Sequence, residues 1–205
     1  MGYTHYYYVN SYYDQDKWDA LIKDVKKLLE LPIPKALLIG NSEDHDYSWC
    51  EIKNLGELIN GKKVTDGNQG HYNINEAEIS FNGVGELAHE QFQLWQKMPP
   101  DVFERQEEFA KKLTIPPELQ PAEESTGGAN MAHQFFECTK TARKPYDIVV
   151  QCCLILAKKH FDTAIAISSD GGKDEWETAI DIIEKNFGYK VKTTWTRDEL
   201  FPKVI

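Results

Sequence analysis

Hydrophobic and polar residues alternate with clear periodicities near the start of the chain. Residues 3–9 are aromatic and β-branched, with the odd-numbered side chains on one face, which predicts a strand. From Gln15 to Leu31 the apolar residues recur at intervals of three and four, which predicts a helix that stops before Pro32. The chain is therefore expected to begin with a strand and an amphipathic helix.

The last third of the chain repeats this alternation. The expected elements are a strand at 135–141, a nearly all-apolar helix at 145–161, a strand at 163–169, a helix capped by Asp174 and ending before Gly188, and a strand at 189–195. Turn residues 170–172 separate the second strand from the second helix. These elements are typical of helices packed on a sheet.

The middle of the chain carries weaker patterns. Short strands are expected at 36–39 and at 78–82, the latter with Ile79 and Phe81 facing inward. Two polar stretches, at about 41–75 and 92–130, are interpreted as excursions from the core, the second with a short helix after Pro100. We therefore predict a single domain, 1–205, that carries two long excursions.

The order of elements predicts an α/β (α+β) fold with helices on a mixed sheet. A split βαβ, ferredoxin-like core with an extra βα(β) unit is favoured, and an open three-layer sheet is the alternative. In the split arrangement the first strand is the central one. A chain of 205 residues is long enough to bury one sizeable core.

Charge and composition exclude several classes of function. Lys and Arg number 23 against 33 Asp and Glu, a net charge of -10 that disfavours duplex nucleic acid as a partner. No apolar run is long enough to span a membrane and no signal peptide is evident, so no membrane association and a cytoplasmic location are expected. The four cysteines form no CxxC pair, the histidines lack metal-ligand spacing, and no nucleotide-binding Gly-rich motif occurs. We predict neither a metal nor a cofactor, and the oligomeric state is left open.

Cations gather between the strand at 135–141 and the apolar helix that follows. Lys140, Arg143 and Lys144 lie beside a helix N-terminus that is itself positive, so they call for an anion. That anion is either internal, with Asp147 or other acidic residues as ion-pair partners, or the phosphate or carboxylate of a ligand.

Other polar residues are expected to converge on this loop. If the strands at 135–141 and 163–169 are parallel, Ser168, Ser169 and Asp170 end at the same sheet edge as the cations. On the central strand, His5 and Tyr7 share one face, although a histidine satisfied within the sheet is the simpler interpretation. The alternative to ligand binding is a turn or helix-capping role for Asp170 and a turn role for Asn82. The predicted ligand-binding residues are His5, Tyr7, Asn82, Lys140, Arg143, Lys144 and Asp170.

Four short blocks of sequence resemble a family of uncharacterised proteins of bacteria and their viruses. The blocks are Gly2-Tyr-Thr-His-Tyr-Tyr7, Ser80-Phe-Asn-Gly83, Lys140-Thr-Ala-Arg-Lys-Pro-Tyr-Asp147 and Ser168-Ser-Asp-Gly171. No established activity comes with the resemblance. It implies that a shared site would be built from His5, Tyr7, Asn82, Lys140, Arg143 and Asp170.

Three functions remain open at this point. The first is binding of an anionic, for example nucleotide-like, small molecule, with sequestration of a signal as one role. The cations would hold its charge, and His5 or Tyr7 would stack on it or form hydrogen bonds to it. The second is a hydrolase for a phosphorylated or acyl substrate, with His5 as general base and Asp170 or water as nucleophile. The third is a protein-interaction module that uses the acidic surface and the Pro-rich stretch.

Overall fold

The computed structural model describes residues 2–32, 34, 72–83, 88–112, 134–193 and 203–205. Its first strand, β1 (Thr4–Asn10), is followed by helix α1 (Gln15–Glu30), whose N-terminus is capped by the Asp14 carboxylate. Both elements confirm the sequence prediction. The buried face of α1 consists of the residues that its periodicity indicated, namely Trp18, Leu21, Ile22, Val25, Leu28 and Leu29.

The main sheet has three strands in the order β5-β1-β6. Strand β5 (Gln134–Lys140) and strand β6 (Ile165–Ser169) are each antiparallel to β1, and are therefore parallel to one another. Helix α5 (Asp147–Phe161) connects them, with β1 inserted between. This is the predicted split βαβ arrangement with the first strand in the centre, and it confirms the α+β class.

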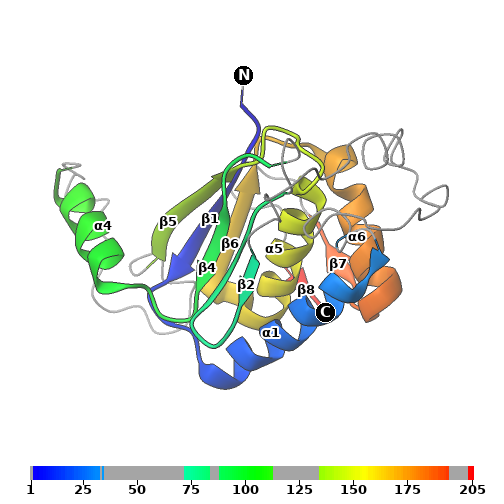
Figure 1. Cartoon of the computed structure of the whole chain (residues 1–205), viewed down its shortest axis with the longest axis horizontal. Helices are drawn as coiled ribbons and strands as arrows, with labels where there is room; N and C mark the ends of the chain where they lie inside the picture. Colours follow the sequence, from blue (N-terminus) through cyan, green and yellow to red (C-terminus); the bar gives the residue numbers. More distant parts are fainter. Residues whose placement is uncertain (1, 33, 35–71, 84–87, 113–133, 194–202) are drawn as a thin grey trace, which may run out of the picture.

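Three helices cover one face of this sheet (Figure 1). Helix α5 packs between α1 and α6 (Lys173–Phe187), which explains why most side chains of α5 are apolar and buried. The ring of Tyr13 stacks on Phe161 with 3.7 Å between centroids, which joins the start of α1 to the end of α5. On the opposite face of the sheet Phe136 is 46% exposed.

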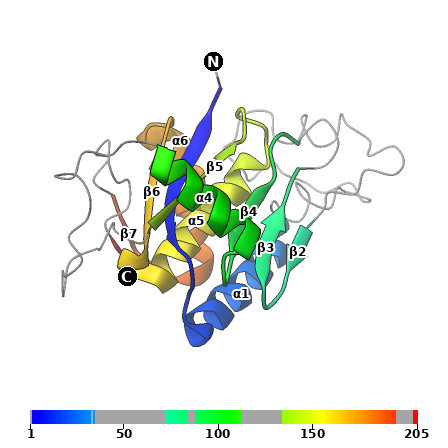
Figure 2. The ribbon, with the colours of Figure 1, turned by 90° about the vertical axis from the view of Figure 1, so that its left-hand side faces the viewer.

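A second sheet, β2 (Tyr72–Ile74), β3 (Glu78–Phe81) and β4 (Phe92–Trp95), lies beside the first (Figure 2). The two are joined where Tyr13 N donates to Gln96 O, at 2.9 Å, and Met98 N donates to Ser11 O, at 2.8 Å. The buried side chains of β3 and β4 belong to the same core as the helices. One continuous core thus extends under both sheets.

Strands β2 and β4 lie within the stretches interpreted as excursions, so that interpretation was too broad. β4 alternates buried and half-buried side chains, a pattern hidden by its length of only four residues. The short helix expected after Pro100 is present as α4 (Pro100–Lys112), which Figure 1 shows apart from the other helices. The expected strand at 36–39 and the Pro-rich stretch lie outside the described residues.

The end of the chain departs from expectation in two details. Gly172, rather than Asp174, is the N-cap of α6, because the Glu175 carboxylate reaches back to accept from the Gly172 N–H at 3.0 Å. In the expected strand at 189–195, the part that forms a strand among the described residues is β7 (Val191–Lys192), which pairs with β8 (Lys203–Val204). A short 3-10 helix, η4 (Asp162–Ala164), links α5 to β6.

No helix in the described part of the chain combines the length and apolar character that crossing a membrane requires.

Candidate functional site

A buried polar cluster lies where β1 begins and where β5 and β6 end. Its members are His5, Asp147 and Ser169, with Tyr3 and Gln151 beside them, and we call it the His5 cluster. His5 is opposite Ser169 in the register of β1 and β6, so both side chains lie on the helix-covered face. Asp147 is the first residue of α5, which starts above this end of the sheet.

A continuous chain of hydrogen bonds runs through the cluster. His5 Nε2 lies 2.6 Å from Asp147 Oδ1, and His5 Nδ1 lies 2.9 Å from Ser169 Oγ. His5 is fully buried and Asp147 is 9% exposed, whereas Ser169 is half-buried and forms the solvent-side end of the chain. A carboxylate accepts but does not donate, so it fixes the proton of the neutral imidazole on Nε2 and leaves Nδ1 to accept from Ser169.

The cluster is enclosed by aromatic and amide side chains. Gln151 Nε2 donates to Asp147 Oδ2 at 2.8 Å, which occupies the second oxygen of that carboxylate. The rings of Tyr3 and Trp176 contact the imidazole of His5 edge to face, at 5.2 and 5.0 Å between centroids. Burial and the nearby charge of Asp147 raise the pKa of Tyr3, so its hydroxyl stays protonated at neutral pH.

The turn that follows Ser169 is shaped by this packing. Gly171 N donates to Ser169 Oγ at 2.9 Å. A Cβ atom at Gly171 would overlap the Tyr3 hydroxyl, so only glycine allows Tyr3 to lie over the cluster here. The backbone after the strand therefore places an N–H donor directly at the serine oxygen.

The cationic loop covers this cluster from outside. Arg143 stacks over the Tyr3 ring, with its Cζ 4.2 Å from the centroid, and its Nε donates to Glu175 Oε1 at 2.8 Å. Tyr3 itself is 1% exposed beneath the guanidinium. We call the Arg143–Glu175 ion pair the clasp, because it joins the loop after β5 to the first turn of α6.

The backbone of the cationic loop is unusual. Ala142 and Arg143 both have left-handed dihedral angles, with φ of 51° and 56°, which non-glycine residues rarely adopt. The N–H groups of Thr141 and Ala142 both donate to Tyr3 O, which holds the loop against β1. Strain of this kind concentrates at functional sites, where the surrounding structure maintains it.

Acidic residues of the chain itself supply part of the negative charge that was expected at the cationic loop. Asp147 places its carboxylate at the start of α5, and Glu175 pairs with Arg143. The first-turn N–H groups of α5 already donate to carbonyl groups of the preceding turn, such as Asp147 N to Lys144 O at 2.9 Å. The helix terminus therefore offers fewer free donors than the sequence suggested.

The other predicted residues lie at varying distances from the cluster. Lys140 is half-buried, opposite Thr4, with its side chain against Gly2, and Lys144 is half-buried in the same loop. Asp170 accepts from Thr4 N at 3.0 Å and from the Tyr6 hydroxyl at 3.2 Å on the open face of the sheet.

Asn82 and Tyr7 have structural contacts instead. Asn82 bonds to both the N–H and the carbonyl of His89, at 3.1 and 2.9 Å, and so holds the segment that precedes β4. Tyr7 is 1% exposed, with its hydroxyl 3.1 Å from Thr139 Oγ1 and 3.0 Å from Gln93 O, which leaves its ring no surface for stacking on a ligand.

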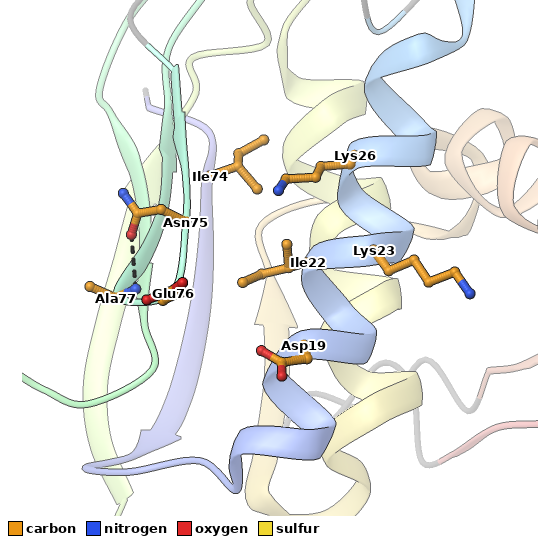
Figure 3. A pocket seen from close by; sticks show the side chains of 8 residues that line it. All are labelled: Asp19, Ile22, Lys23, Lys26, Ile74, Asn75, Glu76 and Ala77. Atoms are coloured by element: carbon orange, nitrogen blue, oxygen red, sulfur yellow. Dashed lines mark hydrogen bonds between the residues drawn. The ribbon is translucent and has the colours of Figure 1, made fainter.

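A separate surface hollow of about 640 Å³ lies between α1 and the β2–β3 turn (Figure 3). It has an apolar floor that includes Ile22 and Ile74, and a rim of mixed charge formed by Asp19, Lys23, Lys26 and Glu76. In Figure 3, Lys26 extends across the hollow toward Ile74, while Lys23 points away. None of the residues predicted from the sequence lines it.

Comparison with protein-family models, with curated proteins and with solved structures found no match. The resemblance to uncharacterised proteins therefore stays a prediction, and the function has to be argued from the site itself.

Sequence reasoning named His5 and the strand end at Ser169 but not their partnership. It considered Asp147 only as a counter-ion and overlooked Gln151 and Glu175. The signal for Ser169 was present, because residues at the ends of parallel strands meet at one edge. The roles of Gln151 and Glu175 depend on where α5 and α6 pack, which periodicity does not determine.

Proposed function

We propose that this protein is a hydrolase for a small acyl or phosphoryl ester, with Ser169 as nucleophile, His5 as general base and Asp147 as the group that orients and stabilises His5. The observation that carries the proposal is the unbroken Ser169–His5–Asp147 chain, with contacts of 2.9 and 2.6 Å. A nucleophile bonded to a base that a third group orients is the arrangement that activates a serine hydroxyl.

The proposed reaction of an acyl ester follows from these contacts. Ser169 Oγ attacks the carbonyl carbon and its proton passes to His5 Nδ1. The bond to the leaving alkoxide then breaks, and the alcohol departs with that proton. Water attacks the resulting acyl-serine, gives a proton to Nδ1, and the carboxylic acid leaves as the proton returns to Ser169 Oγ.

Neighbouring groups support the charge changes in this sequence. The imidazolium formed in each half-reaction lies 2.6 Å from the Asp147 carboxylate, which Gln151 holds in place. The Gly171 N–H donates to Ser169 Oγ at 2.9 Å, which places a backbone donor beside the proposed nucleophile. Because His5 contacts Ser169 through Nδ1, Nδ1 is the ring nitrogen that exchanges the proton with Ser169, the leaving group and water. Nε2 is bonded to Asp147.

Labelling with a fluorophosphonate probe, followed by peptide mass spectrometry, tests the proposal. We expect modification at Ser169 and release of 4-nitrophenol from 4-nitrophenyl acetate. Ser169→Ala should abolish both, whereas Ser168→Ala should keep both. Ser168 is a matched control, since it lies one residue away with its side chain on the opposite face of the sheet, opposite Tyr6.

Two outcomes would refute the proposal. One is a folded wild-type protein that neither reacts with the probe nor hydrolyses any ester or phosphate monoester offered. The other is activity that survives in Ser169→Ala at the wild-type rate. Circular dichroism of each variant separates lost chemistry from lost folding.

Binding of an anionic small molecule without turnover is the second candidate. The observation that favours it is that, among the described residues, neither Nη group of Arg143 has a hydrogen-bond partner. A thermal-shift panel of nucleotides and sugar phosphates, read with wild type and Arg143→Gln, tests it. A shift that depends on Arg143, with the ligand recovered unchanged and no Ser169 labelling, would support binding alone.

A further inference from the structure

We infer that Arg143 selects substrates that carry a separate anionic group, and that this group takes the place of the Glu175 carboxylate on Arg143 when the substrate binds. The inference rests on the proposed hydrolase function. It names a specificity-determining residue and a substrate class, namely short esters whose acyl chain ends in a carboxylate or another anion.

The position of Glu175 supports this exchange. One oxygen of its carboxylate accepts from Arg143 Nε at 2.8 Å, and the other accepts from Gly172 N at 3.0 Å. Gly172 belongs to the turn that directly follows Ser169. A carboxylate is therefore already held between Arg143 and the backbone beside the nucleophile, which is where the charged end of a short acyl chain would lie.

The exposure of the clasp suits replacement of the Glu175 carboxylate by another anion. The side chains of Arg143 and Glu175 are 59% and 37% exposed, and ion pairs this accessible to water contribute little to stability. Opening the clasp leaves no buried charge behind. An incoming anion offers Arg143 an equivalent charge-assisted partner.

Arg143 is also held in a fixed orientation for this role. Its Cζ lies 4.2 Å from the Tyr3 ring centroid, so the guanidinium is held over a buried ring by a cation–π contact. Its backbone is left-handed, with φ of 56°, in a loop that the N–H groups of Thr141 and Ala142 hold against Tyr3 O. Only Nε is bonded to Glu175 among the described residues, so the two Nη groups are available for a bidentate contact.

The same geometry places the clasp beside the proposed site. Tyr3 covers His5, and Arg143 covers Tyr3, so the clasp lies across the outside of the His5 cluster. An anionic substrate that takes the place of Glu175 on Arg143 would therefore bind at the outer side of the His5 cluster. A neutral ester provides no such replacement for Glu175.

The test compares two esters that share a leaving group, 4-nitrophenyl acetate and the 4-nitrophenyl monoester of glutaric acid. For wild type we expect the higher kcat/KM with the anionic ester. Arg143→Gln should lower the ratio of kcat/KM for the anionic ester to kcat/KM for the neutral ester about tenfold, the loss expected for one charge-assisted contact. Glu175→Gln should raise the ratio several-fold, since the competing carboxylate has been removed.

A matched control is Arg105→Gln, which removes an exposed arginine paired with a carboxylate, Asp101, on α4. It should leave the ratio unchanged. Added salt should reduce kcat/KM for the anionic ester more than for the neutral one, because the exposed Arg143 is screened.

The results separate the two proposals. If neither ester is hydrolysed in a Ser169-dependent manner, the hydrolase proposal fails and this inference fails with it. If both are hydrolysed through Ser169 but Arg143→Gln and Glu175→Gln leave the ratio at the wild-type value, the inference alone is overturned. Glu175→Gln keeps the test decisive even if Arg143→Gln fails to fold.

Discussion

Replacement of Asp147 should reveal how much of the fold depends on the His5 cluster. Its two carboxylate oxygens accept from His5 Nε2 at 2.6 Å and from Gln151 Nε2 at 2.8 Å, and the residue is 9% exposed. Asp147→Ala leaves His5 Nε2 buried without its acceptor and leaves Gln151 Nε2 only its longer contact, 3.4 Å, to the Tyr3 hydroxyl. Asp147→Asn keeps the size and one acceptor oxygen, and loses the charge and one contact.

The magnitudes follow from these contacts. Hydrogen bonds to a charged group contribute about 1.5–3 kcal/mol each, so loss of the two bonds to the Asp147 carboxylate should lower the unfolding free energy of Asp147→Ala by about 3–5 kcal/mol. Loss of a single charge-assisted bond costs about 1.5–3 kcal/mol, which is the expectation for Asp147→Asn. In a domain of this size the alanine variant should melt roughly 6–20 °C below wild type.

Urea unfolding followed by circular dichroism measures these differences, with Asp174→Ala as the control. Asp174 is also in the first turn of a helix, but it is exposed. A double-mutant cycle of His5→Leu and Asp147→Leu should give a coupling of at least about 1 kcal/mol. If Asp147→Ala loses less than about 1 kcal/mol, or no more than Asp174→Ala, the reasoning about a buried and mutually dependent cluster is refuted.

Three further predictions concern stability. Burial raises the pKa of Tyr3 and raises that of Tyr189 to about 12, whereas both tyrosines have a pKa near 10 in the unfolded chain. Their contribution to stability should therefore be complete below pH 10 and decline above it. Absorbance at 295 nm should show these rings titrating only with unfolding. Ala142→Gly relieves a left-handed φ and should stabilise by about 1 kcal/mol, whereas Gly188→Ala, at a left-handed helix cap, should destabilise by about 1 kcal/mol, and thermal melts that gave both the same sign would contradict this. Phe161→Ala removes a buried ring stacked on Tyr13 and should cost about 3–5 kcal/mol in urea titrations, with a loss below about 1 kcal/mol counting against tight packing there.

The sequence predicted best where one periodicity extends over many residues. Helix α1 and its buried face were read from the spacing of apolar residues, and β1, β5 and β6 from aromatic and β-branched runs. The central place of β1 followed from the split βαβ hypothesis rather than from any local pattern. Strands β2 and β4, with three and four residues, are too short for alternation to distinguish them from polar loops.

The sequence predicted where the site lies but not which side chains contact one another in it. The sequence indicated that the loop after β5 and the end of β6 share one sheet edge, and the register of Thr4 with Lys140 and of His5 with Ser169 agrees. It did not predict that Asp147 reaches His5, because that contact depends on how α5 lies over β1. Nor did it predict Glu175 as the partner of Arg143, since left-handed angles at Ala142 and Arg143 redirect the loop.

The central position of β1 has a consequence for how the protein is made. The strands that pair with β1 are β5 and β6, which the ribosome synthesises after the strands of the second sheet. A nascent chain therefore carries an aromatic strand with both edges unpaired until β5 has emerged, and with one edge unpaired until residue 169 has emerged, a state prone to pairing with other chains. Such a protein should depend on holding chaperones during translation, and slow release of its final third should lower its yield.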